Sequence, residues 1–408
     1  MRQHTRAVAV WISVLAAGFG SGLSECGRSR ARAEEKAAAP VTNDEGRAFA
    51  RALETAVASG HVEAFDRMID WDAVLDTATS GLGATDSLRK AFSEGVRKGF
   101  REGAGFSGAI VSAVKEGGRY SLLRLQSNRK RPSFLVRFIL PAGGLNYHEF
   151  LIARRPDGQV KAVDLYIFTT GELISQTLRR SFVPAVAHDA RSLIERLTGA
   201  EQDYVKHLSK FEAMSRALIG KRPAEALEVY RRLPPSLQKD KNALMIRCQA
   251  ARTMGDDREY SRAMEDFRAA YPKDASVDFI SIDYYLLKKQ FSEALACVDR
   301  VEKAVGGDPF LQTLRAGISI EKGDLEAARK CLQTAIDQEP TLQVSYEGLI
   351  NVTLQQHKFA ETLKALRLLK ERFHVERKDL ETDPAFMEFV KTPEYREWRR
   401  EGTGKRPD

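Results

Sequence analysis

Four side chains that could bind or transform a small molecule interrupt apolar segments in the first half of the chain. Asp164 and Tyr166 alternate with apolar residues between 160 and 168, while Arg137 and His148 each interrupt another apolar segment. Groups of these types orient ligands and move protons in pockets. If the segments are converging strands, the four residues form a ligand pocket. The alternative is a solvated sheet face, which the alternation favours.

No catalytic motif accompanies these residues. The histidines form no HExxH pair, the cysteines form no CxxC pair, and neither a GxSxG turn nor a Walker loop occurs. The sequence therefore predicts no metal, no cofactor and no assigned catalytic residue. The net charge of +8 is spread over 64 basic and 56 acidic residues. Without a basic helix or an aromatic-basic strand, that balance does not predict nucleic-acid binding.

The segments that carry the four residues belong to an α+β pattern. From Glu45 apolar residues recur at helical spacing, and one of the expected helices covers 85–100. After Gly103 the period becomes two, and strands are expected at 109–114, 120–126, 133–140, 145–153 and 160–168. Helices followed by about five antiparallel strands predict an α+β domain over 45–172.

This order of elements resembles the nuclear-transport-factor-2-like superfamily over roughly residues 45–172. The resemblance rests on helices that precede strands and on the sequence pattern of the last strands, without a diagnostic motif. It implies a curved antiparallel sheet that helices close into a cone. In that superfamily a carboxylate, a histidine and a tyrosine inside the cone work as acid and base. The resemblance therefore implies such a role for Asp164, His148 and Tyr166, with Arg137 nearby.

A 34-residue repeat fills the second half of the chain. Phe291, Leu325 and Phe359 lie 34 residues apart, and each opens a similar phrase. One position of the repeat recurs in register as Ala226, Tyr260, Ala294, Ala328 and Thr362, and apolar residues follow four and seven residues later. The pattern resembles the tetratricopeptide repeat, which forms two helices per unit. Five units are expected over 207–376, as an all-α solenoid in which each unit contacts its neighbours.

The tetratricopeptide resemblance implies a concave groove that binds a protein or a peptide. The residues expected to face it are mixed and partly apolar: Phe211, Met245, Arg252, Phe279, Asp283 and Leu286. Some domains of this family hold an acidic chain end in a clamp of lysine, asparagine and arginine. The clamp positions here hold no cation: Phe211, Ser215, Ile246, Ser276 and Ile280. The expected ligand is therefore an amphipathic or extended apolar segment.

The two ends of the chain predict export and capping. Residues 1–33 have the basic start, apolar stretch and small-x-small site of a signal peptide, and 34–44 have the composition of a linker. An uncleaved signal that tethers the protein to the membrane is the alternative, and no later segment is apolar enough to cross it. Connecting helices are expected over 173–206, and a capping helix with a disordered tail over 377–408.

These features predict an exported scaffold without enzymatic activity, in the periplasm or cell envelope, that binds a protein or peptide in the repeat groove. The alternative is small-molecule binding or acid–base catalysis in the N-terminal cone, with the repeats docking a partner. A third interpretation, an envelope-assembly factor, cannot be separated from the first by composition.

The clamp positions lead to a first test. Titrating the repeat array with an acidic chaperone-tail peptide is expected to give no saturable binding, because no cation at these positions would compensate a carboxylate. Fluorescence anisotropy of the labelled peptide measures this. Micromolar binding that is lost when the carboxylates are neutralised would contradict the prediction.

Overall fold

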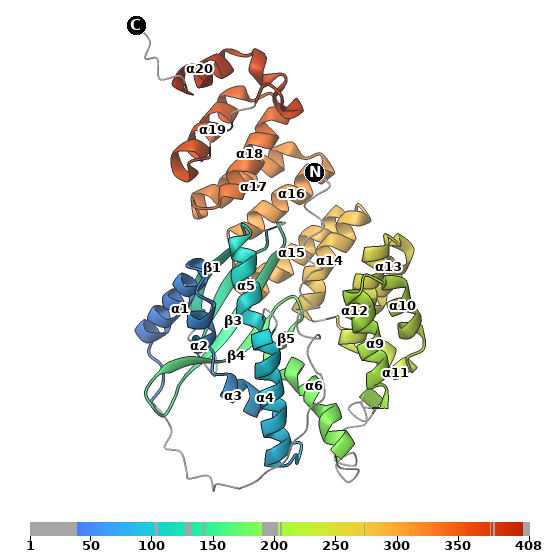
Figure 1. Cartoon of the computed structure of the whole chain (residues 1–408). Coiled ribbons are helices and arrows are strands. Elements are labelled where there is room, and N and C mark those ends of the chain that lie inside the picture. Colours follow the sequence, from blue (N-terminus) through green and yellow to red (C-terminus); the bar gives the residue numbers. More distant parts are fainter. Residues whose placement is uncertain are drawn as a thin grey trace. The chain divides into compact units, whose positions relative to one another are not determined.

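The computed structural model describes residues 39–102, 105–126, 132–141, 143–189, 203–204, 206–272, 274–375, 377 and 380–402. The chain divides into two compact units, Met1–Ile280 and Ser281–Asp408, and each is described by itself (Figure 1). The predicted signal peptide and residues 403–408 of the predicted tail lie outside the described residues. Within the described parts of the chain, no helix combines the length and apolar character that a membrane span requires.

Five helices open the first unit: α1 (Asn43–Ala58), α2 (Val62–Met68), α3 (Trp71–Thr79), α4 (Asp86–Glu102) and α5 (Gly105–Lys115). A capping box starts α1, because the Thr42 side chain accepts from the Glu45 backbone and the Glu45 side chain accepts from the Thr42 backbone. The buried face of α1 repeats at helical spacing, through Ala50, Leu53 and Val57.

The prediction of a strand at 109–114 is wrong, because this segment lies in α5. The buried residues Phe106, Ile110 and Ala113 recur at intervals of four and three, which places them on one helical face. The ring of Phe106 packs against Phe65 of α2, with centroids 6.2 Å apart. The β-branched Ile110 and Val111 suit a strand locally, but packing against α1 and α2 decides the outcome.

The sheet is a five-stranded antiparallel meander whose strands lie in sequence order: β1 (Arg119–Gln126), β2 (Ser133–Ile139), β3 (Leu145–Arg154), β4 (Val160–Ile167) and β5 (Glu172–Leu173). The first four strands coincide with the four later segments that the period of two predicted. Gly158, with φ of +85°, lies in the turn between β3 and β4, where its lack of a side chain permits the left-handed backbone.

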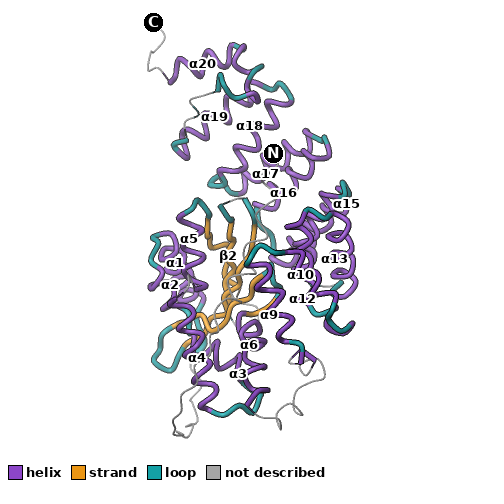
Figure 2. Tube along the Cα trace, turned by 45° about the vertical axis from the view of Figure 1, so that its right-hand side comes forward, coloured by secondary structure: helices purple, strands orange, loops and turns teal. Residues whose placement is uncertain are grey.

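Both faces of this sheet are buried. On the first face, Phe134, Phe138 and Phe150 join an apolar core with residues of the preceding helices, and Figure 2 shows α1, α2 and α5 beside the strands. The second face carries residues that are each at most 4% exposed: Leu135, Arg137, Tyr147, Glu149 and Asp164. An antiparallel sheet commonly leaves one face in water, so the second face must be covered by another part of the protein.

The described residues that follow the sheet in the first unit are mainly helical. The sequence predicts separate connecting helices at 172–180 and 189–197, with Pro184 between them. Instead, helix α6 (Ile174–Asp189) continues past Pro184, and it contacts α3 and β4. The second predicted connecting helix lies largely outside the described residues. The repeat helices follow as α9 (Leu208–Ile219), α10 (Pro223–Arg231), the short α11 (Pro235–Gln238), α12 (Lys241–Met254), α13 (Asp257–Ala270) and the first half of α14 (Ala275–Leu287).

The second unit continues the helix pairs as α15 (Phe291–Val305), α16 (Phe310–Lys322), α17 (Leu325–Gln338), α18 (Gln343–Gln355) and α19 (Phe359–Phe373). The second helix of each of the five pairs starts at 223, 257, 291, 325 or 359, so the 34-residue period is kept throughout. The predicted helical repeat is confirmed, and the helices fit a tetratricopeptide solenoid.

C-terminal residues cover the last repeat. They form the short 3₁₀ helices η3 (Pro384–Phe386) and η4 (Phe389–Lys391) and the helix α20 (Pro393–Gly402). Phe386, Phe389 and Trp398 share one apolar cluster with Leu366 and Leu369 of α19. Burial of these rings closes the apolar end that the final helix pair would otherwise expose.

Close packing between paired helices leads to a second test. Ala316 of α16 is 1% exposed, so Ala316→Trp is expected to destabilise the protein by about 1–3 kcal/mol through overpacking. Gly317→Trp in the same helix is the matched control, since a Cβ at Gly317 meets nothing within 4 Å. Urea unfolding measures both variants. Equal midpoints for Ala316→Trp and the wild type would refute the assignment of helix faces.

Candidate functional site

The sheet separates the four residues that the sequence proposed for a ligand pocket. His148 pairs with Val136 and Ile167 across the strands, which places it on the first face, toward the helices. Arg137 and Tyr166 belong to the opposite set of cross-strand pairs and lie on the second face. Asp164 lies there too, two residues from Tyr166. Because neighbouring residues point to opposite faces, the four do not converge.

His148 is held in one tautomer by its neighbours. Asn146 Oδ1 accepts from the backbone N–H groups of Tyr147, at 2.8 Å, and Thr169, at 3.1 Å. The amide nitrogen Nδ2 of Asn146 therefore faces His148 Nε2, 3.1 Å away, and donates to it. Nδ1 must then carry the hydrogen, which it donates to the Tyr120 hydroxyl oxygen at 2.9 Å.

Aromatic rings fill the space around His148. The centroids of Phe106, Tyr120 and Phe138 each lie 5.6 Å from its imidazole. Burial lowers the pKa of His148 from 6.5 to about 3, and it raises the pKa of Tyr120 well above its ordinary value. At neutral pH the imidazole is therefore uncharged and enclosed, and the interior that a ligand would need is occupied by side chains.

The charged residues of the second face are not on a solvated surface. Arg137 is 2% exposed and Asp164 is 4% exposed. Asp164 Oδ1 accepts from the backbone N–H of Leu165, at 2.9 Å, and of Ser175, at 3.3 Å, and Oδ2 accepts from the Ser175 hydroxyl at 2.5 Å. A buried carboxylate must be satisfied in this way, because an uncompensated charge in an apolar setting is costly.

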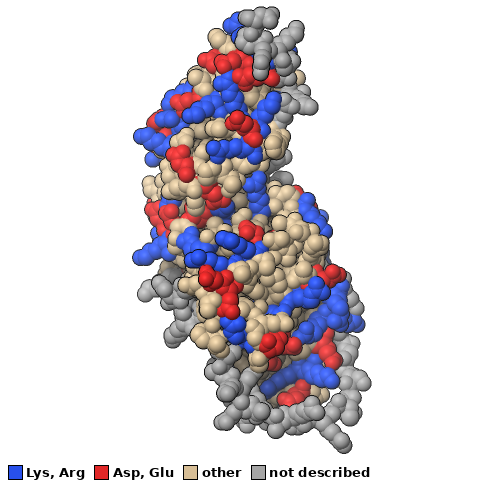
Figure 3. All heavy atoms as spheres, turned by 90° about the vertical axis from the view of Figure 1, so that its left-hand side faces the viewer, with Lys and Arg blue, Asp and Glu red and all other residues tan. Residues whose placement is uncertain are grey.

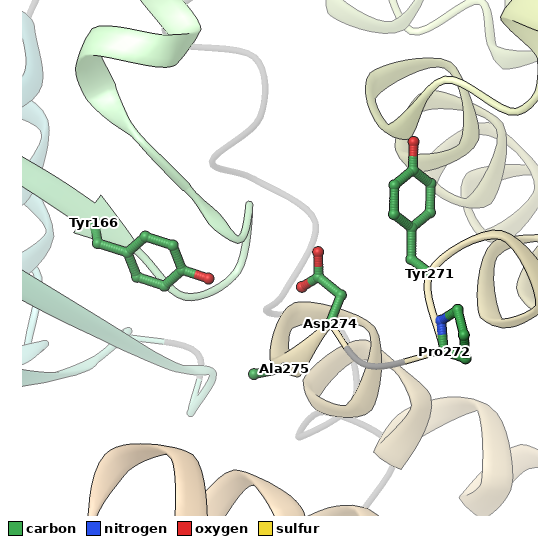
Figure 4. A pocket seen from close by; sticks show the side chains of 5 residues that line it. All are labelled: Tyr166, Tyr271, Pro272, Asp274 and Ala275. Carbon is green, nitrogen blue, oxygen red and sulfur yellow. The ribbon is translucent and has the colours of Figure 1, made fainter.

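An open cavity of about 580 Å³ lies beside the second face, lined by Tyr166, Tyr271, Pro272, Asp274 and Ala275. Figure 4 shows the Tyr166 side chain reaching from the sheet toward Asp274 and the start of α14 at Ala275. Of the four proposed pocket residues, Tyr166 is the one that lines this cavity. The Asp274 carboxylate is already paired with Lys241 Nζ at 2.5 Å, so it offers little charge to a ligand.

The six residues expected to line the repeat groove divide into two sets. Phe211, Met245 and Phe279 are 2%, 6% and 7% exposed, so they are core residues. Phe211 packs on Tyr204, with ring centroids 4.5 Å apart. The remaining three are half-buried: Arg252, Asp283 and Leu286. Three of the six predicted groove residues are therefore buried within the chain.

Some of the corresponding positions of later repeats are more accessible, whereas Leu354, two periods beyond Leu286, is buried. We call six residues the open row: Thr313, Gly317 and Ile320 of α16, which lie one period beyond Phe279, Asp283 and Leu286, and Val344, Glu347 and Asn351 of α18, which lie two periods beyond Ser276, Phe279 and Asp283. Gly317 is exposed with open space where a Cβ would stand, and Val344 is 37% exposed. A hydrogen bond of 2.8 Å between the Thr313 and Ser345 hydroxyls links the two helices. The 34-residue register could have identified these positions.

The described residues contain no group of three or more histidine, cysteine, aspartate or glutamate side chains placed to hold a metal ion. Basic and acidic side chains are interspersed over the face shown in Figure 3. This distribution matches the diffuse charge of the sequence and gives that face no single sign.

Burial of His148 predicts how stability changes with pH. The pKa is about 3 in the folded protein and near 6.5 when unfolded, so the unfolded chain takes up a proton first as pH falls. The contribution of neutral His148 to the free energy of unfolding is complete above about pH 6.5, and it declines as the pH falls toward 3. The loss at pH 5 relative to neutral pH is expected to be about 2 kcal/mol from this residue.

Urea unfolding at pH 7 and pH 5 measures this loss. His148→Gln should remove that part of the pH dependence, whereas His357→Gln, at an exposed residue, should retain it. An unchanged pH dependence in His148→Gln would show that the imidazole is not buried in its neutral form.

Comparison with known proteins gives only distant structural likeness. No protein-family model matches the chain, and no curated protein does. Among solved structures, "MamA RS-1 ArsTM double mutant" is 18% identical, with a TM-score of 0.36, covering 41% of this chain and 93% of that one. "MamA MSR-1 C2" is 16% identical, with a TM-score of 0.34, covering 41% of this chain and 96% of that one. At these scores the likeness carries no argument about function.

Proposed function

We propose that the protein is a non-enzymatic scaffold that binds a segment of another protein at the open row. One observation carries the proposal: the open space above Gly317, between half-buried Thr313 and Ile320 on the same helix. Helix pairs that present such a row offer a ready surface for an extended chain, because the row repeats at a fixed spacing.

The chemistry of the open row favours a mixed segment. Ile320 and Val344 can cover apolar side chains, while Thr313 and Asn351 can hydrogen-bond to a peptide backbone. Glu347 is the charged member of the row, and its carboxylate accepts from Gln343 at 2.9 Å. A negative group in this place repels an acidic chain end. We therefore propose an amphipathic or extended apolar ligand, in keeping with the expectation from the clamp positions.

A small-molecule or acid–base function in the N-terminal domain has less support. His148 is uncharged and surrounded by rings, and Arg137 and Asp164 lie on the opposite face of the sheet. An acid–base pair needs its groups within reach of one substrate. Export to the cell envelope remains part of the proposal, and it rests on the composition of residues 1–33.

Filling the open row tests the proposed function. Peptides are first selected from a displayed random library on the full chain, and their affinities are then measured by fluorescence anisotropy. Gly317→Trp should raise Kd by about tenfold or more, because the indole occupies the centre of the surface without disturbing the core.

Lys330→Trp provides the matched control, since it adds the same side chain at an exposed position of α17. It should leave the affinity unchanged. Peptides that bind both variants as tightly as the wild type would place the binding surface elsewhere.

A further inference from the structure

The second face of the sheet is covered by the start of the repeat array. Tyr147 of β3 packs edge-on against Phe279 of α14, with ring centroids 6.2 Å apart. Tyr147 is fully buried and Phe279 is 7% exposed. Phe279 is a predicted groove residue at the fifth position of the third repeat. The predicted groove residue Phe279 is therefore covered by Tyr147, an aromatic side chain from the sheet of the same protein.

A second contact joins the turn before β5 to two repeats. Lys241, the first residue of the second repeat, donates from Nζ to the Gly171 carbonyl oxygen at 3.2 Å and pairs with Asp274 Oδ2 at 2.5 Å. Ser276 donates from its hydroxyl to Asp274 Oδ1 at 2.7 Å. We call Lys241, Asp274 and Ser276 the Gly171 socket. Ser276 is fully buried and also holds a predicted clamp position.

A side chain at Gly171 would force the residues of this socket to shift. Its φ is +65°, in the left-handed region that favours glycine. A Cβ built there would lie 2.2 Å from Lys241 Nζ, 2.6 Å from Ser276 Oγ and 2.8 Å from Asp274 Oδ1. Backbone conformation and close approach thus both favour glycine at this position.

The charges of Lys241 and Asp274 in the socket compensate each other. Lys241 and Asp274 are 17% and 21% exposed in their side chains, so their pairing is only partly screened by water. Burial opposes ionisation of Asp274, but the hydrogen bonds from Lys241 and Ser276, with the charge of Lys241, lower its pKa. Beside the socket, the Glu172 carboxylate accepts from Arg180, which fixes the start of α6.

We propose that the α+β domain is an intramolecular ligand of its own repeat array. The second face and the Gly171 turn occupy the predicted groove positions at the start of the second and third repeats. These positions are thereby closed to outside segments, and they open only if the domain undocks. The inference stands apart from the proposed function, because it concerns residues of the first unit and not the open row.

Hydroxyl-radical footprinting of the full chain tests this docking. Gly171→Ala forces a Cβ into the socket and should increase oxidation of Tyr147 and Phe279 by about fivefold or more. Phe267, a fully buried residue of α13, should stay protected, which separates undocking from unfolding. Met387, 58% exposed, serves as the internal reference in every sample.

Gly158→Ala is the matched control for backbone strain. Gly158 also has a positive φ, of +85°, but a Cβ there meets nothing within 4 Å. It should leave Tyr147 and Phe279 protected. If Gly171→Ala leaves both residues as protected as in the wild type, or if Gly158→Ala exposes them equally, the proposal is overturned.

If Gly171→Ala unfolds the protein and exposes Phe267 as well, a second variant that adds no side chain to the socket is needed to test the docking. Lys241→Met removes the ion pair and the hydrogen bond to Gly171, and it should expose Tyr147 and Phe279 while Phe267 stays protected. Lys358→Met is its control, because it breaks an exposed pair with Glu326. Wild-type protection of Tyr147 and Phe279 in Lys241→Met would overturn the proposal.

Discussion

The burial of both faces of the antiparallel sheet is the constraint on which the first unit depends. One face is covered by the helices that precede it, through rings such as Phe134 and Phe150. The other face carries Arg137 and Asp164 beside Tyr147, and burying charges is tolerated only where hydrogen bonds compensate them. That face needs a second layer, and Phe279 of α14 contributes to it. This explains why the first compact unit continues through the initial repeats to Ile280.

The same constraint gives one kind of position two different roles along the array. In the second and third repeats, Met245, Ser276 and Phe279 are buried and contribute to the core. In the second unit, Thr313 and Glu347, one and two periods beyond Phe279, are half-buried, and Val344, two periods beyond Ser276, is exposed. Within the first unit Tyr147 packs on Phe279, and a surface that is already buried cannot also bind a partner.

Environment also decides what the ionisable residues can do. His148 resembles a catalytic base by type alone, but desolvation among aromatic rings keeps it neutral, and Asn146 fixes its tautomer. Asp164 is likewise committed to Ser175 and to backbone N–H groups. Such groups organise a core. A binding function is more readily supported by the accessible helix faces, where side chains are in contact with solvent.

The sequence by itself determined the features that repeat locally. The 34-residue period placed five helix pairs, because each unit contacts its neighbours and encodes its own packing, and alternation placed β1 to β4. It failed at 109–114, where β-branched residues suit a strand locally but packing against α1 and α2 favours a helix. It also did not show that His148 and Asp164 lie on opposite faces in buried surroundings, or that Phe279 is covered. Burial is set by segments distant in the sequence, so only the tertiary structure decided which candidate residues remain accessible.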